Sequence, residues 1–157
     1  MRWLLLLVAL ILSAQSKYSG PRPAEQDLPY LLHASNLVAT ESGEAREEKR
    51  KDDMANIVAG AASAARTPLS EPIFLFSSSK IPVEKLALYE MDVKNGNREI
   101  VFPTNPRKQK DAPQPIRLSV QRLEPGLFRL EATKGLDNGE YCLSPSGSQQ
   151  VFCFQVY

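Results

Sequence analysis

The residue types that carry most catalytic and metal-binding chemistry are scarce in this chain. His33 is the single histidine, and Cys142 and Cys153 are the two cysteines. Zinc and copper sites are built from several histidine, cysteine or carboxylate ligands at characteristic spacing, and no such set accompanies His33. We therefore expect no metal site and no cofactor.

Two kinds of hydrolytic chemistry can be tested against the sequence. A serine hydrolase would combine His33 with a nucleophile turn such as G-x-S-x-G, which the chain lacks. Glycoside hydrolases use paired carboxylates, but the acidic residues at 41–53 alternate with basic ones, as is typical of a solvated surface. We expect no enzymatic activity. The alternative is an envelope glycan- or peptide-acting hydrolase that uses dispersed carboxylates and His33.

The two cysteines flank a turn signal. Gly147-Ser148 suits a two-residue hairpin, because glycine provides the positive φ that opens a type II′ turn. In the resulting register Cys142 lies opposite Cys153 in a hydrogen-bonded pair, whose Cα atoms are about 5.5 Å apart and within disulfide range. An oxidising compartment then favours an intramolecular bridge. A redox-active pair is the alternative, but no C-x-x-C motif and no adjacent histidine or lysine activates a thiol.

The same register gives the hairpin two distinct faces. Because side chains alternate along a strand, the cysteines share one face, and we expect their bridge to lie outside the core. The other face is predicted to pack in the core, and its residues are Tyr141, Leu143, Phe152 and Phe154.

Short apolar runs separated by turn signals cover much of the remaining chain, a pattern typical of a β-sandwich. Residues 73–76 form an apolar run typical of a buried strand. Asn95-Gly96 predicts a type I′ hairpin with Lys94 opposite Asn97. The charged segment 41–53 has three interpretations: a charged edge strand, a short helix or a docking surface.

A proline-rich stretch at residues 103–115 interrupts the strands. Prolines remove donors from a sheet ladder, so this stretch predicts a long exposed connection. Its basic residues Arg107, Lys108 and Lys110 form a candidate interaction loop, since long ordered loops often carry binding function. The alternative is a simple crossover between sheets whose charge favours solubility.

The N-terminal segment predicts export. A basic start, an apolar run at residues 4–12 and a small polar stretch form the pattern of a signal peptide cleaved after Ser16. The apolar run is shorter than the ~20 residues that cross a bilayer, so no membrane span is expected after cleavage. Residues 17–29 predict a proline-rich linker before a β-sandwich domain at 30–157. The mature protein is expected in the periplasm or the extracellular medium.

The charge balance bears on partners. The 19 basic side chains include Arg2 in the leader, and the 18 acidic ones all lie beyond it. The mature chain is therefore close to neutral, whereas a nucleic-acid partner requires a strong basic excess. We expect no nucleic-acid binding.

The stretch Leu136-Asp137-Asn138-Gly139-Glu140-Tyr141 resembles the tyrosine corner of immunoglobulin-like sandwiches, in which a phenol bonds an upstream backbone group. The resemblance implies an all-β, immunoglobulin-like Greek-key β-sandwich whose corner comprises Asp137, Gly139 and Tyr141. The mature sequence also resembles uncharacterised exported bacterial proteins with a terminal GEYCL…FCFQV hairpin, which implies no particular activity. We expect a non-catalytic binding module of the cell envelope whose partner is an envelope or extracellular protein or a surface polymer.

Overall fold

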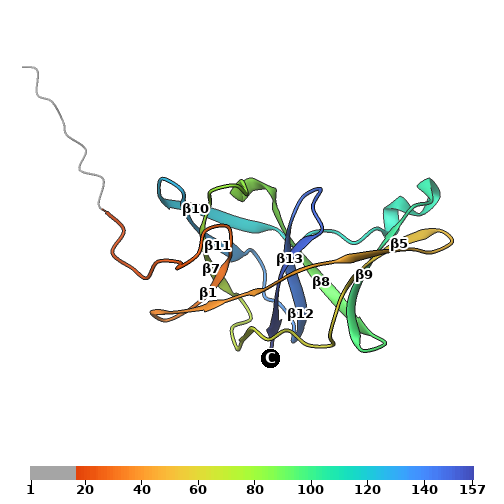
Figure 1. The fold of residues 1–157 in the computed structure, drawn as a ribbon, viewed down its shortest axis with the longest axis horizontal. Coiled ribbons are helices and arrows are strands. Elements are labelled where there is room, and N and C mark those ends of the chain that lie inside the picture. Colours follow the sequence, from red (N-terminus) through yellow and green to blue (C-terminus); the bar gives the residue numbers. More distant parts are fainter. Residues whose placement is uncertain (1–16) are drawn as a thin grey trace, which may run out of the picture.

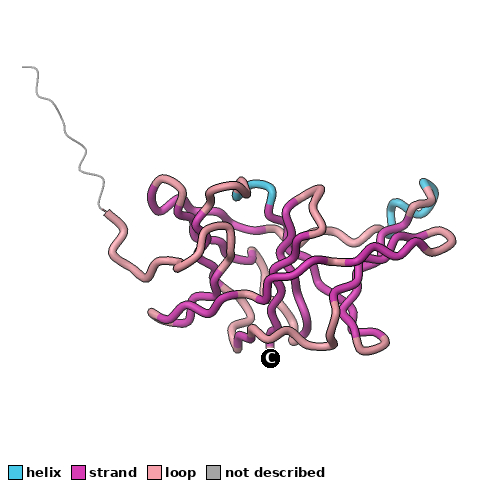
Figure 2. Tube along the Cα trace, viewed as in Figure 1, coloured by secondary structure: helices cyan, strands magenta, loops and turns pink. Residues whose placement is uncertain are grey.

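The computed structural model describes residues 17–157, so the predicted signal peptide at 1–16 lies outside the described residues. The described part forms two sheets that pack against each other, with almost all strand pairs antiparallel (Figures 1 and 2). This confirms the predicted all-β, sandwich-like fold. Kinship with immunoglobulin domains stays a prediction.

The first sheet has five strands in the order β10-β11-β7-β1-β2. The predicted buried run at 73–76 lies in its central strand, and Phe74, Leu75 and Phe76 are all buried. The bounds are Tyr30–His33 for β1, Asn36–Ala39 for β2, Ile73–Ser77 for β7, Leu118–Glu124 for β10 and Leu127–Ala132 for β11.

The second sheet has eight strands, of which seven follow the order β3-β13-β12-β8-β9-β5-β4. The remaining strand, β6, pairs in parallel with β13. The bounds are Glu41–Glu44 for β3, Arg46–Lys49 for β4, Asp53–Val58 for β5, Arg66–Thr67 for β6, Leu86–Lys94 for β8, Asn97–Pro103 for β9, Gly139–Pro145 for β12 and Gln150–Val156 for β13.

The second sheet closes on itself. Strands β3 and β4 stand at opposite ends of its order, yet only Ala45 separates them in the chain. The Ala45 N–H donates to the Gln149 carbonyl (2.8 Å), so the segment follows β13 before it reaches β5. In Figure 1 this segment runs as one extended ribbon from β1 past β13 to β5. With β3 and β4 counted as one strand, the sheet is a small barrel.

The charged segment 41–53 is therefore extended, and the interpretation of it as a short helix is wrong. Its residues 41–44 pair with β13 and its residues 46–49 pair with β5, and a turn closed between Arg50 and Asp53 leads into β5. The short helical elements lie elsewhere, in two 3₁₀ turns: η1 (Val83–Lys85) and η2 (Pro106–Asp111). The second lies within the proline-rich connection.

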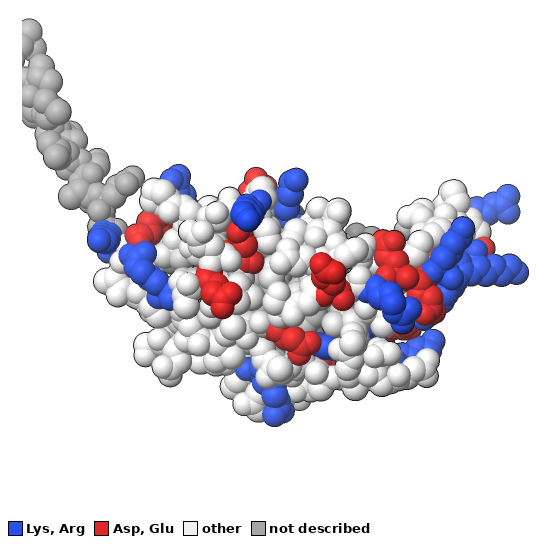
Figure 3. Space-filling model, viewed as in Figure 1, with Lys and Arg blue, Asp and Glu red and all other residues white. Residues whose placement is uncertain are grey.

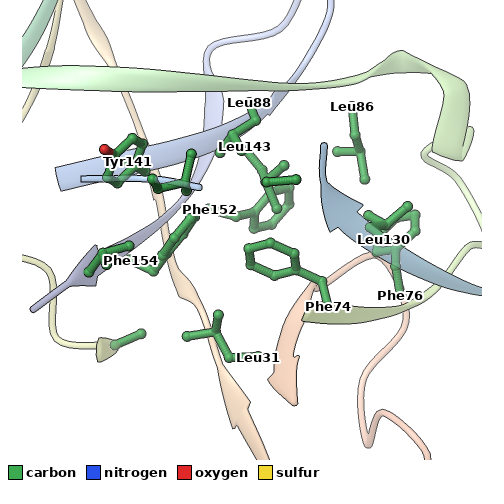
Figure 4. Close-up of a cluster of buried hydrophobic side chains, with 14 of the residues drawn as sticks. Leu31, Phe74, Phe76, Leu86, Leu88, Leu130, Tyr141, Leu143, Phe152 and Phe154 are labelled. Atoms are coloured by element: carbon green, nitrogen blue, oxygen red, sulfur yellow. The ribbon is translucent and has the colours of Figure 1, made fainter. Parts of the chain in front are cut away.

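The main core lies between the two sheets (Figure 4). Phe74 of the first sheet meets Phe154 of the second edge to face, with ring centroids 5.1 Å apart. Tyr141 stacks on the other side at 5.7 Å from Phe154. The predicted core face of the last hairpin is confirmed, because Tyr141, Leu143, Phe152 and Phe154 all belong to this cluster.

Strands β12 and β13 are buried on both faces over their central residues. Their second face looks into the barrel, where a separate apolar cluster forms. This explains why residues 151–154 of β13 form a continuous apolar run instead of an alternating one. The cluster comprises Val58, Met91, Ile100, Cys142, Val151 and Cys153, with Ala45, Tyr89 and Phe102 packed against it.

The two predicted hairpin turns have different outcomes. Lys94 pairs with Asn97, and Asn95 (φ 52°) and Gly96 (φ 75°) both have positive φ, which confirms the type I′ prediction. The second turn is one residue earlier than predicted, because the Ser148 N–H bonds the Pro145 carbonyl (3.1 Å). Gly147 then takes the third position with φ 78°, where a type II turn requires glycine.

The predicted linker at 17–29 forms no strand, yet it contacts the domain. The Asp27 carboxylate accepts hydrogen bonds from the N–H groups of Ser79, Lys80 and Ile81. Arg22 pairs with Glu124 near the end of β10. Both contacts lie at the same loop end of the first sheet, since the Ser78 N–H in turn bonds the Gly126 carbonyl.

Candidate binding site

The side chains inside the barrel change along its axis from charged, through apolar, to cavity-lining. Alternate residues of one strand point the same way, and three strands present the same sequence of a charged group, an apolar residue and a residue that lines a cavity. These series are Arg98, Ile100 and Phe102 on β9, Glu140, Cys142 and Ser144 on β12, and Glu41, Ala45 and Glu47 on the extended segment made of β3, Ala45 and β4, where Gly43 adds no side chain.

A buried guanidinium closes the charged end. The Arg98 side chain is only 1% exposed and pairs with Glu41 Oε1 at 2.7 Å. It also donates to the Ser63 hydroxyl (2.6 Å) and to the carbonyls of Ala59 (2.6 Å) and Gly60 (2.9 Å). Arg98 thus fastens the loop of small residues at 59–65 across this end of the barrel.

A second carboxylate completes this buried cluster. Glu140 Oε2 accepts from both the N–H (3.1 Å) and the hydroxyl (2.6 Å) of Ser63. Its other oxygen, Oε1, is buried without a hydrogen-bond partner in the described residues. We call Arg98, Glu41, Glu140 and Ser63 the polar plug. Because a buried charge is costly unless it is paired and hydrogen-bonded, the plug depends on all its members.

The disulfide lies in the middle of the barrel. Cys142 and Cys153 are bonded, as predicted, but they are 2% and 0% exposed and belong to the inner apolar cluster. The expectation of a bridge outside the core is wrong, because the barrel buries the second face of the sheet. Their Cα atoms are 4.0 Å apart. That distance fits the closer, non-hydrogen-bonded pair of an antiparallel ladder, not the predicted hydrogen-bonded one.

The other end of the barrel holds a cavity of about 350 Å³. This volume is at the lower end of the range of small-molecule sites, roughly 300–1,000 Å³. Tyr89 and Phe102 meet there edge to face, with ring centroids 5.8 Å apart. The other lining residues are Ala45, Glu47, Asn56, Ala87, Met91, Ile100, Cys142, Val151 and the stretch from Ser144 to Gln149.

The cavity wall leaves polar groups free for a ligand. Among the side-chain hydrogen bonds of residues 17–157, none uses the Tyr89 hydroxyl or the Asn56 carboxamide. Glu47 Oε1 accepts from Gln149 Nε2 (2.5 Å), which leaves the Oε2 oxygen available. An apolar wall with a few convergent polar groups is the usual composition of a ligand site.

Sequence reasoning did not identify these cavity residues. One signal was present: Tyr89, Met91, Ile100 and Phe102 lie on one face of the predicted Asn-Gly hairpin, which is more apolar than a solvent-facing surface requires. The polar residues Glu47 and Asn56 gave no such signal, since charged and amide side chains are common on exposed strands.

The tyrosine corner lies on the opposite face of β12 from the cavity. The Tyr141 hydroxyl donates to the Asp137 carbonyl at 2.9 Å. The ring covers Gly139, where an added Cβ would lie 3.7 Å from a Tyr141 ring carbon. Burial, together with the nearby charges of Glu90 and Asp137, raises the pKa of Tyr141 to about 12.

A Tyr141→Phe variant is expected to lose about 1 kcal/mol of stability, because one net hydrogen bond disappears while the ring stays packed. The raised pKa means that the folded state disfavours the phenolate. Stability from this group is therefore complete below pH 10 and declines as the pH rises toward 12. Urea unfolding measures the first effect. In an absorbance titration of tyrosine ionisation, the variant should lack the component that titrates at the highest pH in the parent chain. An unchanged titration would contradict this assignment.

The basic loop lies on the outside of the molecule. Arg107, Lys108 and Lys110 are exposed on η2, and the Lys108 ammonium pairs with Asp52 at 3.3 Å. Figure 3 shows positive and negative side chains gathered together at the end of the molecule where Figure 1 labels β5 and β9. The structure does not bring these three basic residues into the cavity wall.

His33 lies apart from both features. Its Nε2 atom is 2.9 Å from the Thr67 hydroxyl, in a shallow surface groove with Val38 and Leu69. Within residues 17–157, no cluster of three or more His, Cys, Asp or Glu residues is placed to hold a metal ion.

Comparisons with protein-family models, curated proteins and solved structures found no match for this chain. Among the described residues, no helix has the length and apolar character that a membrane-spanning helix requires. The disulfide fits a compartment outside the reducing cytoplasm.

Proposed function

We propose that this chain is an exported, non-catalytic binding module of the cell envelope or the extracellular space, and that it binds a small ligand in the barrel cavity. The observation that carries the proposal is the cavity itself, a chamber of about 350 Å³ whose wall combines apolar and aromatic side chains with polar groups, some of them without hydrogen-bond partners in the described residues. Export is supported by the signal-peptide pattern and by the disulfide.

The asymmetry of the barrel supports this function. The polar plug blocks one end, so a ligand enters from the end lined by Glu47, Ser144 and Gln149. The walls are held by the ladders of β12 with β13 and with β8, by the ladder of β5 with β9, and by the disulfide, which limits the conformational cost of binding. A largely preformed site of this kind favours binding over chemistry, because its wall carries Glu47 as its one titratable acid and no histidine.

The test uses N-phenyl-1-naphthylamine, an uncharged dye whose fluorescence rises in apolar surroundings. We expect saturable, one-to-one binding to the folded chain. An Ala87→Trp variant should weaken binding at least about tenfold, because the indole fills the cavity. Val120→Trp is the matched control, since Val120 is 47% exposed on β10 and does not line the cavity.

Unfolding midpoints of both variants establish that they are folded. If the dye does not bind the parent chain, or if a folded Ala87→Trp variant binds it as tightly as the parent does, the cavity is not a binding site and the proposal fails.

A further inference from the structure

The cavity that we propose as the binding site has a one-sided charge. Glu47 is the single charged residue among its lining residues. The described residues contain no ion pair between Glu47 and a lysine or arginine; its neighbour is the uncharged amide of Gln149. No ion pair in the described residues thus offsets the Glu47 carboxylate at the cavity mouth.

Two of the other charges on β4 are paired with each other. Glu48, the next residue of β4, pairs with Arg46 and Arg50 on the outer face of the barrel. Arg50 also pairs with Glu99, whose side chain is only 8% exposed. Lys49, two residues after Glu47 on the same face of the strand, forms no ion pair in the described residues, so the Glu47 carboxylate at the mouth has no ion-pair partner there.

The remaining groups in the wall can contact the apolar part of a ligand or form hydrogen bonds with its polar group. Tyr89 and Phe102 present aromatic surface, and a cation over the face of such a ring is attracted to it. Met91 and Ile100 extend the apolar wall toward the disulfide. The Asn56 carboxamide supplies both an acceptor and a donor.

We infer that the cavity binds a primary amine carried on a small apolar body about the size of one aromatic ring. The body lies against Met91 and Ile100, and the ammonium bonds the free oxygen of Glu47. Such a group is supplied either by a free amine or by the N-terminal residue of a polypeptide, and both share this chemistry. This inference rests on the proposed function, since it names the ligand class of the same site.

The test compares three ligands of similar shape: 2-phenylethylamine, 2-phenylethanol and 3-phenylpropionate. Their binding is followed through the side-chain methyl resonances of Met91, which lines the cavity, and of Met54, which does not. We expect the amine to bind about two- to fivefold more tightly than the alcohol, with the carboxylate weakest, because a charge-assisted hydrogen bond to the exposed Glu47 carboxylate forms only with the amine. The Met91 resonance should shift and that of Met54 should not.

Glu47→Gln should abolish the preference for the amine while leaving the affinity for the alcohol within about twofold, because the glutamine keeps the shape of the side chain. Glu44→Gln is the matched control, because this substitution also removes one negative charge, but Glu44 lies on β3 outside the cavity wall. The peptide Phe-Gly-Gly-amide and its N-acetylated form separate the two sources. Binding of the free peptide, lost on acetylation, indicates a polypeptide N-terminus, and binding of 2-phenylethylamine alone indicates a free amine.

Equal affinities for the three ligands, tighter binding of the carboxylate, or a preference for the amine that survives Glu47→Gln would each overturn the inference. The dye separates these failures from failure of the proposed function. If the dye binds the parent chain in any of those outcomes, the proposed function stands and only the ligand class is wrong. If the dye does not bind, the proposed function itself has failed.

Discussion

Replacement of Arg98 by methionine is expected to destabilise the folded chain by about 3–5 kcal/mol, the usual cost of removing one partner from a buried ion pair. The methionine fills much of the same volume. Glu41 loses its ion pair, however, and the carbonyls of Ala59 and Gly60 lose their donors. These groups stay partly buried, so water compensates them poorly.

Urea unfolding followed by far-ultraviolet circular dichroism measures this effect. Arg46→Met is the matched control, because the Arg46 side chain is 65% exposed and its pairing with Glu48 contributes little. We expect the control to stay within about 0.5 kcal/mol of the parent chain. If Arg98→Met were no less stable than Arg46→Met, the polar plug would not hold the end of the barrel.

A second variant separates the loss of charge from the loss of packing. Adding Glu41→Gln to Arg98→Met removes the unpaired carboxylate, so the double variant should recover part of the lost stability. A double variant that is less stable than Arg98→Met by the full effect of Glu41→Gln alone would indicate that the two side chains act independently.

Joint replacement of Cys142 and Cys153 by alanine is expected to cost about 3 kcal/mol. The bridge closes a loop with a sequence separation of 11, and loop entropy predicts a stabilisation of about this size. Both sulfur atoms are also packed in the inner cluster, so their removal leaves space that the ladder cannot fully close.

The measurement compares urea midpoints of the parent chain and the alanine variant, each with and without a strong reductant. Reductant should destabilise the parent chain and leave the variant unchanged, which makes the variant its own control. A parent chain that unfolds at the same urea concentration in both conditions would contradict a stabilising bridge.

Local pairing could be predicted from the sequence, whereas closure of the barrel could not. The pairing of Lys94 with Asn97 follows from an Asn-Gly turn, and that of Cys142 with Cys153 follows from a short loop and a consistent apolar face. Both depend on residues close together in the chain. The exact turn was wrong by one residue because glycine suits the second residue of a type II′ turn and the third residue of a type II turn, and Gly147 takes the latter place.

The cavity depends on pairings that no local pattern specifies. Glu44 pairs with Gln150, and Arg46 pairs with Ile57 on the other side of the same extended segment. The charged residues of 41–49 gave no sign that they bridge two strands, since the same composition suits a solvated helix or an edge strand. The buried position of the disulfide was missed for this reason: without the barrel, the second face of the sheet would meet solvent.

The extended segment formed by β3, Ala45 and β4 also affects the order in which strands can pair during synthesis. In a chain that leaves the ribosome or a translocation pore from its N-terminus, β3 emerges roughly one hundred residues before β13, and closing so long a loop is slow. Until then the inner face of β8 and β9 has no cover, and its aromatic residues are exposed to other chains. The segment that completes the barrel is thus synthesised early but pairs with β13 late. In the interval its backbone is unpaired on that side, and its dense mixture of charged side chains opposes pairing with the wrong strand.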